Sequence, residues 1–358
     1  MINQQLAEIS NLALVVTIVL YVLALIGFGA DLASSSQRRS DARLAARDRA
    51  EARRVEQAAT VGGGAPAGGA ATALADAPSG GAGGDVAGED AAEHGMTAQR
   101  FAFVIASAAT ALHLVGVLTR ALATQRVPWA NMYEFATTST AIAMVAFLAF
   151  SVRRTELRAL GTFVVGPVLL VLLLAQTFWI VPAAELTPSL QNSHWIYIHI
   201  GVAIIATALS ILGAVVAGMQ LLQARHEQAL VARGSAGEEF PEHWGRFGHV
   251  LDRLPSSTVL ESLSFRIHSV AFVCWTFTLI FGAIWAREAW GRFWGWDPKE
   301  VWTFIIWVVY AAYLHARATR GWSGPPSAWL SIVGYLCIIF NFTVVNVYFS
   351  GLHSYSGL

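Results

Sequence analysis

The sequence predicts an all-α polytopic integral membrane protein with about eight transmembrane helices and both termini outside. Of its 358 residues, 55% are apolar and only 13% are charged, whereas soluble domains are about one-quarter charged. The apolar residues gather in stretches of about 20, the length of helix that crosses a hydrocarbon core about 30 Å thick. The formal net charge is zero, which argues against a nucleic acid as a partner.

Eight apolar stretches are long enough to span a membrane. Residues 1–33 hold the first, and residues 34–99 form an insertion that is first Arg-rich and then Gly/Ala-rich. The Arg-rich part is compatible with a short charged helix, while the Gly/Ala-rich part has too few large apolar side chains to fold and predicts a flexible linker. Residues 100–358 form the main membrane domain. The predicted spans are approximately 10–31, 101–120, 132–152, 159–181, 195–223, 265–287, 300–316 and 329–350.

The distribution of basic residues predicts which side each segment faces. If the insertion at 34–99 is cytoplasmic, the cytoplasmic segments hold 18 of the 23 basic residues, in agreement with the positive-inside rule. The external ones are then Arg120, Arg126, Arg287, Arg292 and Lys299. Both termini therefore face outward, and so does the loop 288–302 between the sixth and seventh spans.

The loop 288–302 has an unusual composition. Its stretch "WGRFWGWDPKEVW" contains Trp290, Trp294, Trp296 and Trp302, together with Lys299, the only lysine of the chain. An aromatic belt at the membrane interface explains tryptophans alone. Such a belt does not need the Asp-Pro-Lys-Glu run that is threaded through them.

Six histidines lie within or beside spans, where ionisable groups are costly and need partners. His199 lies about one turn inside the outer end of the fifth span, and His353 follows the eighth span as it leaves the membrane. His315 lies fifteen residues beyond the start of the seventh span, which is about 22 Å of helix and therefore deep in the membrane. His113 and His268 lie inside the second and sixth spans. For these three buried positions, taken alone, a structural hydrogen bond is the simpler interpretation.

Two histidines on one face beside an aromatic loop favour a heme site. Imidazole is a common axial ligand of heme iron, and the tryptophans of the loop offer faces for a porphyrin ring. Arg292 and Lys299 offer cations for its two propionates. Asp297 and Glu300 are better suited to fixing the loop, by pairing with those cations or by capping the seventh span. A hydrogen-bonded interfacial anchor remains the alternative for each histidine.

The stretch "WGRFWGWDPKEVWTFIIWVVYAAYLHAR" resembles the tryptophan-rich WWD signature that the system I and system II cytochrome c maturation families share. The chain is more similar to the system II heme-handling component of the CcsA/ResC type, called CcsB in some bacteria. "RVPWANMYEF" resembles an external segment of that family, with matches at Asn131, Tyr133 and Glu134. "SHWIYIHIG" resembles the segment with its first external histidine, and "VNVYFSGLHSYSG" resembles its ending, with the second.

The resemblance implies a set of heme-binding residues. His199 and His353 would be the axial ligands of heme iron at the external face. His315 would receive heme within the bilayer, with the opposite ligand supplied by a ResB-type partner subunit, and His113 is a further candidate without a secure role. The WWD loop would bind the heme through Trp290, Gly291, Arg292, Trp294, Trp296, Asp297, Pro298, Lys299 and Glu300.

The function that the resemblance implies is system II cytochrome c maturation. The protein would bring heme b across a bacterial cell membrane and present it at the outer face. Two thioether bonds would form there between the heme vinyl groups and the thiols of a CxxCH motif in apocytochrome c. The chain would act as a heme lyase, or holocytochrome c synthase component, in a heterodimer with the ResB-type subunit. A thioredoxin-like thiol reductant would take part indirectly.

Three alternatives make different predictions. A system I heme-handling protein is the nearest, and the ending of the chain argues against it. A b-type electron carrier usually has paired histidines at opposing depths within its spans and holds its heme permanently. A transporter or scaffold without heme would explain the tryptophans as a belt and the histidines as anchors, and it would purify colourless.

Overall fold

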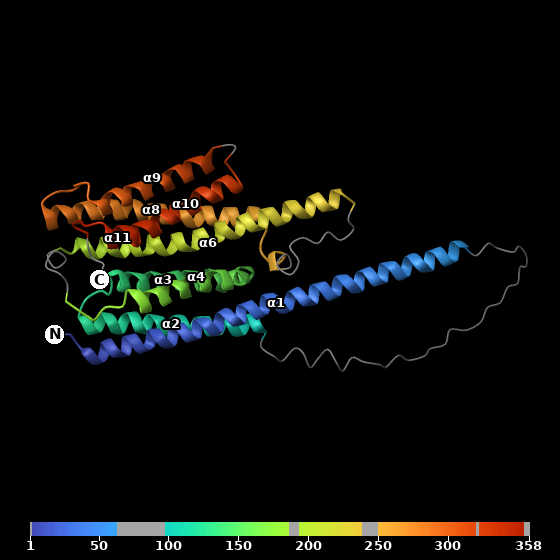
Figure 1. Ribbon diagram of the computed structural model, residues 1–358, viewed down its shortest axis with the longest axis horizontal. Helices are drawn as coiled ribbons and strands as arrows, with labels where there is room; N and C mark the ends of the chain where they lie inside the picture. The colour runs from blue at the N-terminus through green and yellow to red at the C-terminus, as the bar shows by residue number, and fades with distance from the viewer. Residues whose placement is uncertain (1, 63–96, 186–192, 238–249, 320–321, 354–358) are drawn as a thin grey trace, which may run out of the picture. The chain divides into compact units, whose positions relative to one another are not determined.

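The computed structural model describes residues 2–62, 97–185, 193–237, 250–319 and 322–353. Every regular element in this part of the chain is a helix, which confirms the all-α class (Figure 1). The elements are α1 (Gln4–Gly62), α2 (Ala98–Thr124), α3 (Met132–Arg153), the 3₁₀ helix η1 (Thr155–Leu160), α4 (Gly161–Phe178), α6 (Trp195–Ser235), α8 (Ser257–Trp290), α9 (Pro298–Ala318), α10 (Pro325–Phe342) and α11 (Val344–Tyr348).

The chain divides into two compact units. One comprises Met1–Leu32 and Ala98–Leu358, called the membrane unit below, and the other comprises Ala33–Thr97. The Arg-rich part of the predicted insertion does not form a separate short helix, because α1 continues through it to Gly62. Its many alanine, arginine and glutamate residues favour helix. The Gly/Ala-rich part, predicted as a linker, lies mostly outside the described residues.

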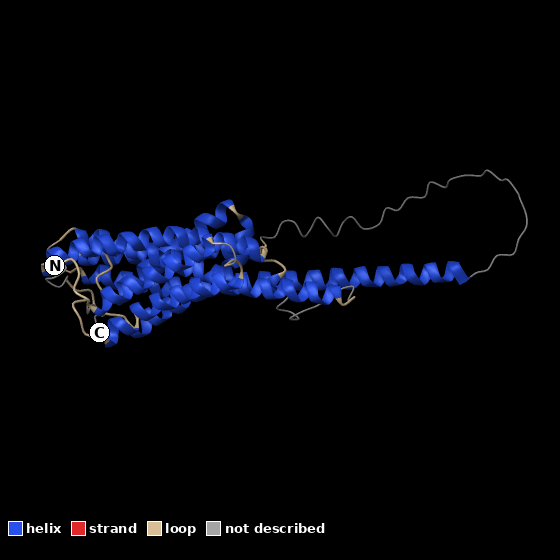
Figure 2. Cartoon of the chain, turned by 90° about the horizontal axis from the view of Figure 1, so that it is seen from above, coloured by secondary structure: helices blue, strands red, loops and turns tan. Residues whose placement is uncertain are grey.

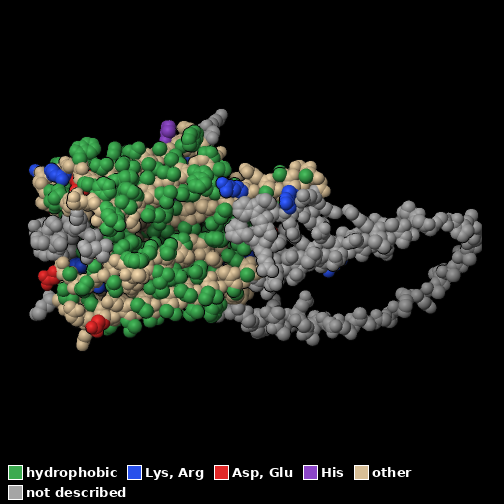
Figure 3. Space-filling model, in the orientation of Figure 1, with side chains coloured by type: hydrophobic (Ala, Val, Ile, Leu, Met, Phe, Trp, Pro, Cys, Tyr) green, Lys and Arg blue, Asp and Glu red, His purple; other side chains and the backbone are tan. Residues whose placement is uncertain are grey.

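Eight helices in the described part of the chain are long and apolar enough to cross a membrane, as predicted. They are Gln4–Ala33, Ala98–Thr124, Met132–Arg153, Thr155–Phe178, Trp195–Ser235, Ser257–Trp290, Pro298–Ala318 and Pro325–Tyr348. In Figure 3 hydrophobic atoms dominate the flank of the membrane unit, and the visible charged side chains gather near its ends. The chain is therefore a multi-pass membrane protein.

The start of α1 and the end of α11 lie at the same end of the membrane unit, which we call the terminal end (Figures 1 and 2). An even number of spans requires this arrangement. The start of α1 is joined there to the end of α2, since the Asn3 amide donates to the Ala123 carbonyl oxygen at 2.9 Å. The side of the membrane that the terminal end faces stays a prediction from the arginine distribution.

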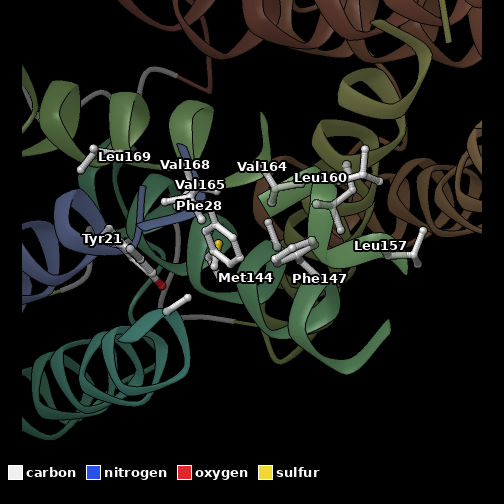
Figure 4. Packing of buried hydrophobic residues seen from close by; sticks show 14 of the residues in the cluster. Tyr21, Phe28, Met144, Phe147, Leu157, Leu160, Val164, Val165, Val168 and Leu169 are labelled. Atoms are coloured by element: carbon white, nitrogen blue, oxygen red, sulfur yellow. The ribbon is translucent and has the colours of Figure 1, made fainter. Parts of the chain in front are cut away.

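The first core of the membrane unit lies among α1, α2, α3, η1, α4, α6 and the first half of α8. Figure 4 shows Phe28 of α1 close to Met144 and Phe147 of α3. Lipid tails are as apolar as leucine, so close packing rather than burial from water must hold membrane helices together. Small residues permit close packing between α1 and α2, where a Cβ on Gly27 would lie only 3.0 Å from the Cβ of Ala102.

The second core lies among α6, α8, α9 and α10 and is more aromatic. Trp275, Tyr310 and Tyr313 are its largest buried side chains, and Ile306 and Ile338 pack with them. Because α6 and α8 contribute to both cores, these two helices join the halves of the membrane unit. The second core forms the floor beneath the site at the terminal end.

His268 occupies a notch in this second half. It is fully buried on α8, and its Nδ1 donates to the Ser264 carbonyl oxygen at 2.9 Å. Its imidazole lies against Gly213 of α6, where a Cβ would overlap the ring. The histidine is accommodated only because residue 213 has no side chain.

We therefore expect Gly213→Ala to destabilise the protein by about 1–3 kcal/mol, the usual cost of overpacking a core. Gly218→Ala is the matched control on the same helix, because a Cβ there would meet nothing within 4 Å. Thermal unfolding of the two detergent-purified variants checks this. Equal melting temperatures for the two variants would contradict the claim that Gly213 makes room for His268.

Candidate functional site

The loop between α8 and α9 is built from two helix ends. Gly291 ends α8 in the left-handed conformation, with φ 72°, which glycine adopts without a steric penalty. Asp297 is the N-cap of α9, Pro298 follows it, and Glu300 completes a capping box. These residue types satisfy the free N–H groups at the start of a helix. Four of the predicted loop residues thus determine where the helices stop and start.

Glu300 holds the loop in one conformation. Its side chain is 8% exposed and accepts hydrogen bonds from the Gly295 amide at 2.8 Å and the Asp297 amide at 3.1 Å. It also forms an ion pair with Arg292 at 3.3 Å. Glu300 thus has the expected pairing role, and Asp297 has the expected capping role. Asp297 also contacts the C-terminal segment.

The Asp297 carboxylate binds the C-terminal segment. It accepts from the Leu352 amide at 2.7 Å and from His353 Nδ1 at 2.9 Å. Glycine at residue 351 permits this close approach, because a Cβ there would overlap the same carboxylate. Burial alone would raise the pKa of Asp297, but the hydrogen bonds from His353 and Leu352 outweigh it and bring the pKa below its ordinary value. An ionised carboxylate only accepts, so His353 donates from Nδ1 and carries its lone pair on Nε2.

His199 has the same tautomer for a different reason. It lies in the second turn of α6, and its Nδ1 is 2.9 Å from the Thr278 carbonyl oxygen of α8. A carbonyl oxygen cannot donate, so Nδ1 donates and the lone pair is on Nε2. Gly282 makes room for the ring, since a Cβ there would lie 2.8 Å from His199 Cε1.

Trp285 lies beside both histidines. Its ring is parallel to that of His199, with an interplanar angle of 10° and centroids 6.0 Å apart. It meets His353 edge to face, with centroids 5.7 Å apart. Trp290 also contacts both Trp285 and His353, at 4.6 and 4.8 Å. Trp285 was not among the predicted site residues, because in the sequence it is one more tryptophan at the end of an apolar run.

His199 and His353 line one cavity at the terminal end. The cavity has a volume of about 1190 Å³, which includes space that is open to the outside. Its walls are mainly apolar and aromatic. They also contain Trp129, Phe135, Ile200, Trp275, Trp285, Phe293, Trp294 and Phe342.

The predicted tryptophans of the loop have different surroundings. Trp294 lines the cavity, whereas Trp290 packs behind His353. Trp296 is 73% exposed and has a φ of 59°, a conformation that bulky residues rarely adopt. Only one of the three therefore faces the cavity in this structure.

Lys299 joins the loop to the last span. Its Nζ donates to the Asn341 carbonyl oxygen at 2.7 Å and to Asn346 Oδ1 at 3.2 Å. Asn341 is in the last turn of α10, whose carbonyl groups lack helical partners and attract cations. Lys299 also lines the cavity. Two of its three N–H donors are thus engaged by the protein, and one remains for a ligand.

The segment 126–134 forms another wall of the cavity. Asn131 lines it and caps α3 by accepting from the Glu134 amide at 2.9 Å. Glu134 is 1% exposed and binds Arg126 at 2.7 Å and Arg120 at 3.1 Å. Tyr133 is buried and donates to Asn11 Oδ1 at 3.3 Å. Two arginines on one buried carboxylate hold this wall in place, and none of these three charged side chains lines the cavity.

A family model for the cytochrome c assembly protein matches residues 101–353. The chain belongs to this family. It is similar to the protein "Cytochrome c biogenesis protein CcsA" of Parasynechococcus marenigrum (strain WH8102), with 40% identity over 48% of this chain and 58% of the relative. The CcsA proteins of Synechococcus sp. (strain CC9902) and Chlamydomonas reinhardtii are 41% and 37% identical, over 48% of this chain and 59% and 43% of their own lengths.

The resemblance to the CcsA type is thereby confirmed. The chain spans about half the length of the curated relatives it matches. The matched range of the family model contains the whole cavity, from the wall at 126–134 to His353. The family of this chain is therefore one of cytochrome c assembly, which disfavours the transporter and scaffold alternatives.

The remaining predicted histidines of this family member lie outside the cavity. His315 is exposed on α9, the span with the smallest buried share, 17%. His113 is fully buried on α2, with Nδ1 3.4 Å from the hydroxyl of Tyr21 on α1. Its surroundings are those of a structural histidine.

We expect Asp297→Ala to release the C-terminal segment. Losing a hydrogen bond to a charged group costs about 1.5–3 kcal/mol, or roughly a 10- to 100-fold faster amide exchange. Hydrogen–deuterium exchange of a peptide containing Leu352 measures this. Glu288→Ala, which removes an exposed carboxylate from the last turn of α8, is the control. Equal exchange in the two variants would contradict the role of Asp297.

Proposed function

We propose that this chain is the heme-presenting component of system II cytochrome c maturation. In this proposal it holds heme b as its substrate at the terminal end, with His199 and His353 as axial ligands. It presents the heme for thioether bond formation with the CxxCH motif of apocytochrome c. The activity is that of a heme lyase, or holocytochrome c synthase component.

The observation that carries the proposal is the convergence of two histidines from distant segments on one cavity. Each imidazole has its Nδ1 bound to an acceptor, at 2.9 Å in both cases, so each directs its lone pair to Nε2. Such orientation by a second partner is typical of metal-binding histidines. A donor set of two imidazoles in an aromatic cavity fits heme iron. Lys299 offers its remaining N–H group to a propionate.

The chain's part in the chemistry is positioning. The heme brings the iron and the vinyl groups, and the apocytochrome brings the thiols, each of which adds its sulfur to one vinyl carbon and its hydrogen to the other. No nucleophile is needed from this chain. A rigid cavity that fixes a reactant supplies catalysis by orientation, and the capped loop and the Glu134 network provide that rigidity.

The arginine distribution supports an external location for the terminal end in a bacterial cell membrane. With that end outside, the cavity opens where the apocytochrome is found. This orientation also places His315 towards the cytoplasmic side, about 22 Å along α9 from the loop.

His315 supports a second, inner heme position shared with a ResB-type subunit. Its side chain is exposed on the least covered span, and exposed ionisable groups in membranes usually have a functional partner. A ligand from the partner subunit would complete this position. Heme would then move from His315 to the cavity within the heterodimer, with a thioredoxin-like reductant keeping the substrate thiols reduced.

A maturation assay tests the proposal. Cells that lack a cytochrome c maturation system would express this chain, a ResB-type subunit and a reporter apocytochrome, and covalent heme would be measured by heme staining. His199→Ala and His353→Ala should reduce the signal at least 10-fold, because each removes an axial ligand.

His194→Ala is the matched control, since His194 is an exposed histidine that caps the same helix as His199 and does not line the cavity. It should mature the reporter as the unchanged chain does. Full maturation by both ligand variants would overturn the proposal.

A further inference from the structure

We infer that His199 is the ligand that leaves the iron when the histidine of the CxxCH motif binds, and that His353 stays. This inference rests on the proposed function and adds the order of ligand exchange. It follows from a difference between the two acceptors to which the Nδ1 atoms of these histidines donate.

The Nδ1 atoms of the two histidines donate to acceptors of different charge. His353 donates to the Asp297 carboxylate, whereas His199 donates to the neutral Thr278 carbonyl oxygen. Thr278 lies inside α8 (Ser257–Trp290), so its carbonyl also belongs to the hydrogen-bond ladder of that helix. His199 therefore has the weaker acceptor, and it shares that acceptor.

A carboxylate at Nδ1 makes an imidazole a stronger ligand. Hydrogen bonds to an ionised partner are roughly twice as strong as neutral ones, and a carboxylate partner raises the basicity of a metal-binding histidine. His353 should therefore donate more strongly to iron than His199. Between two axial bonds on one iron, the one to the weaker donor breaks first.

The backbone near His353 also supports the inference that this histidine stays bound to the iron. Asp297 binds both the His353 ring and the Leu352 amide, so the segment that carries His353 is fixed at two points to the start of α9. The Asp297 carboxylate is in turn fixed by its own role as N-cap. His353 thus has little freedom to withdraw from the cavity.

The exchange is balanced without a co-reactant. The bond between His199 Nε2 and iron breaks as the neutral imidazole of the incoming peptide forms the new one. No electron or proton is transferred. His353 holds the opposite side of the iron throughout, so the heme stays in the cavity while its vinyl groups meet the thiols.

Heme retention in glycine variants tests the inference. His199→Gly and His353→Gly would be made in a His315→Ala background, purified with the ResB-type subunit and loaded with hemin, so that the pyridine hemochrome assay counts only heme held in the cavity. We expect His199→Gly to keep at least half of the heme of the His315→Ala complex, and added imidazole should restore its low-spin spectrum. His353→Gly should keep less than a tenth.

Asp297→Asn isolates the contribution of the carboxylate, because asparagine is as good an N-cap as aspartate. In this variant the midpoint potential of the heme should rise, since the weaker donor stabilises ferric iron less. Combined with His199→Gly, it should reduce heme retention to the level of His353→Gly. A purely structural role for Asp297 would leave the potential unchanged.

The outcomes separate the two proposals. An unchanged complex without heme would overturn the proposed function. A complex that binds heme but retains it equally in the two glycine variants, or better in His353→Gly, would overturn only the order of exchange. An unchanged midpoint potential in Asp297→Asn would also overturn that order.

Discussion

The site depends on one carboxylate that joins three separate parts of the chain. Asp297 caps α9, receives the Leu352 amide and orients the His353 ring. The loop, the seventh span and the C-terminal segment are thus joined at one carboxylate. Glu300 supports the same arrangement from within the loop. The loop side of the cavity is therefore held by hydrogen bonds to two acidic side chains, Asp297 and Glu300.

The charged groups near the cavity each have a structural partner, as groups at a membrane interface need. Lys299 donates to a carbonyl oxygen at the end of α10. Arg292 pairs with Glu300, and Glu134 pairs with Arg120 and Arg126. The only lysine of the chain is well suited to its place, because a compact ammonium group can serve a helix end and still leave one donor for a ligand. The aromatic side chains of the loop thus serve to enclose a ligand, and its charged side chains fix the conformation of the loop.

Much of the fold could be predicted because hydropathy and span length are local properties, and a topology with eight spans brings His199 and His353 to the same end. The contacts that make the site could not be predicted from such local properties. Asp297 and His353 are joined across 56 residues, and no periodicity reports such a contact. The break of the last span after Phe342 and the acceptors of Lys299 are likewise tertiary features. Trp285 was missed because tryptophan in an apolar run usually signals packing, and only its contacts with the two histidines distinguish it.

The measurement that tests the account most directly is the low-temperature electron paramagnetic resonance spectrum of the oxidised, detergent-purified complex. Two imidazole ligands on one ferric heme give a low-spin signal. We expect this signal in a His315→Ala complex loaded with hemin, where only the cavity offers two imidazoles, at a yield that matches its b-type pyridine hemochrome, and we expect its loss when either His199 or His353 is also replaced. A colourless protein, or a low-spin signal that survives both replacements, would contradict a heme site between these two histidines.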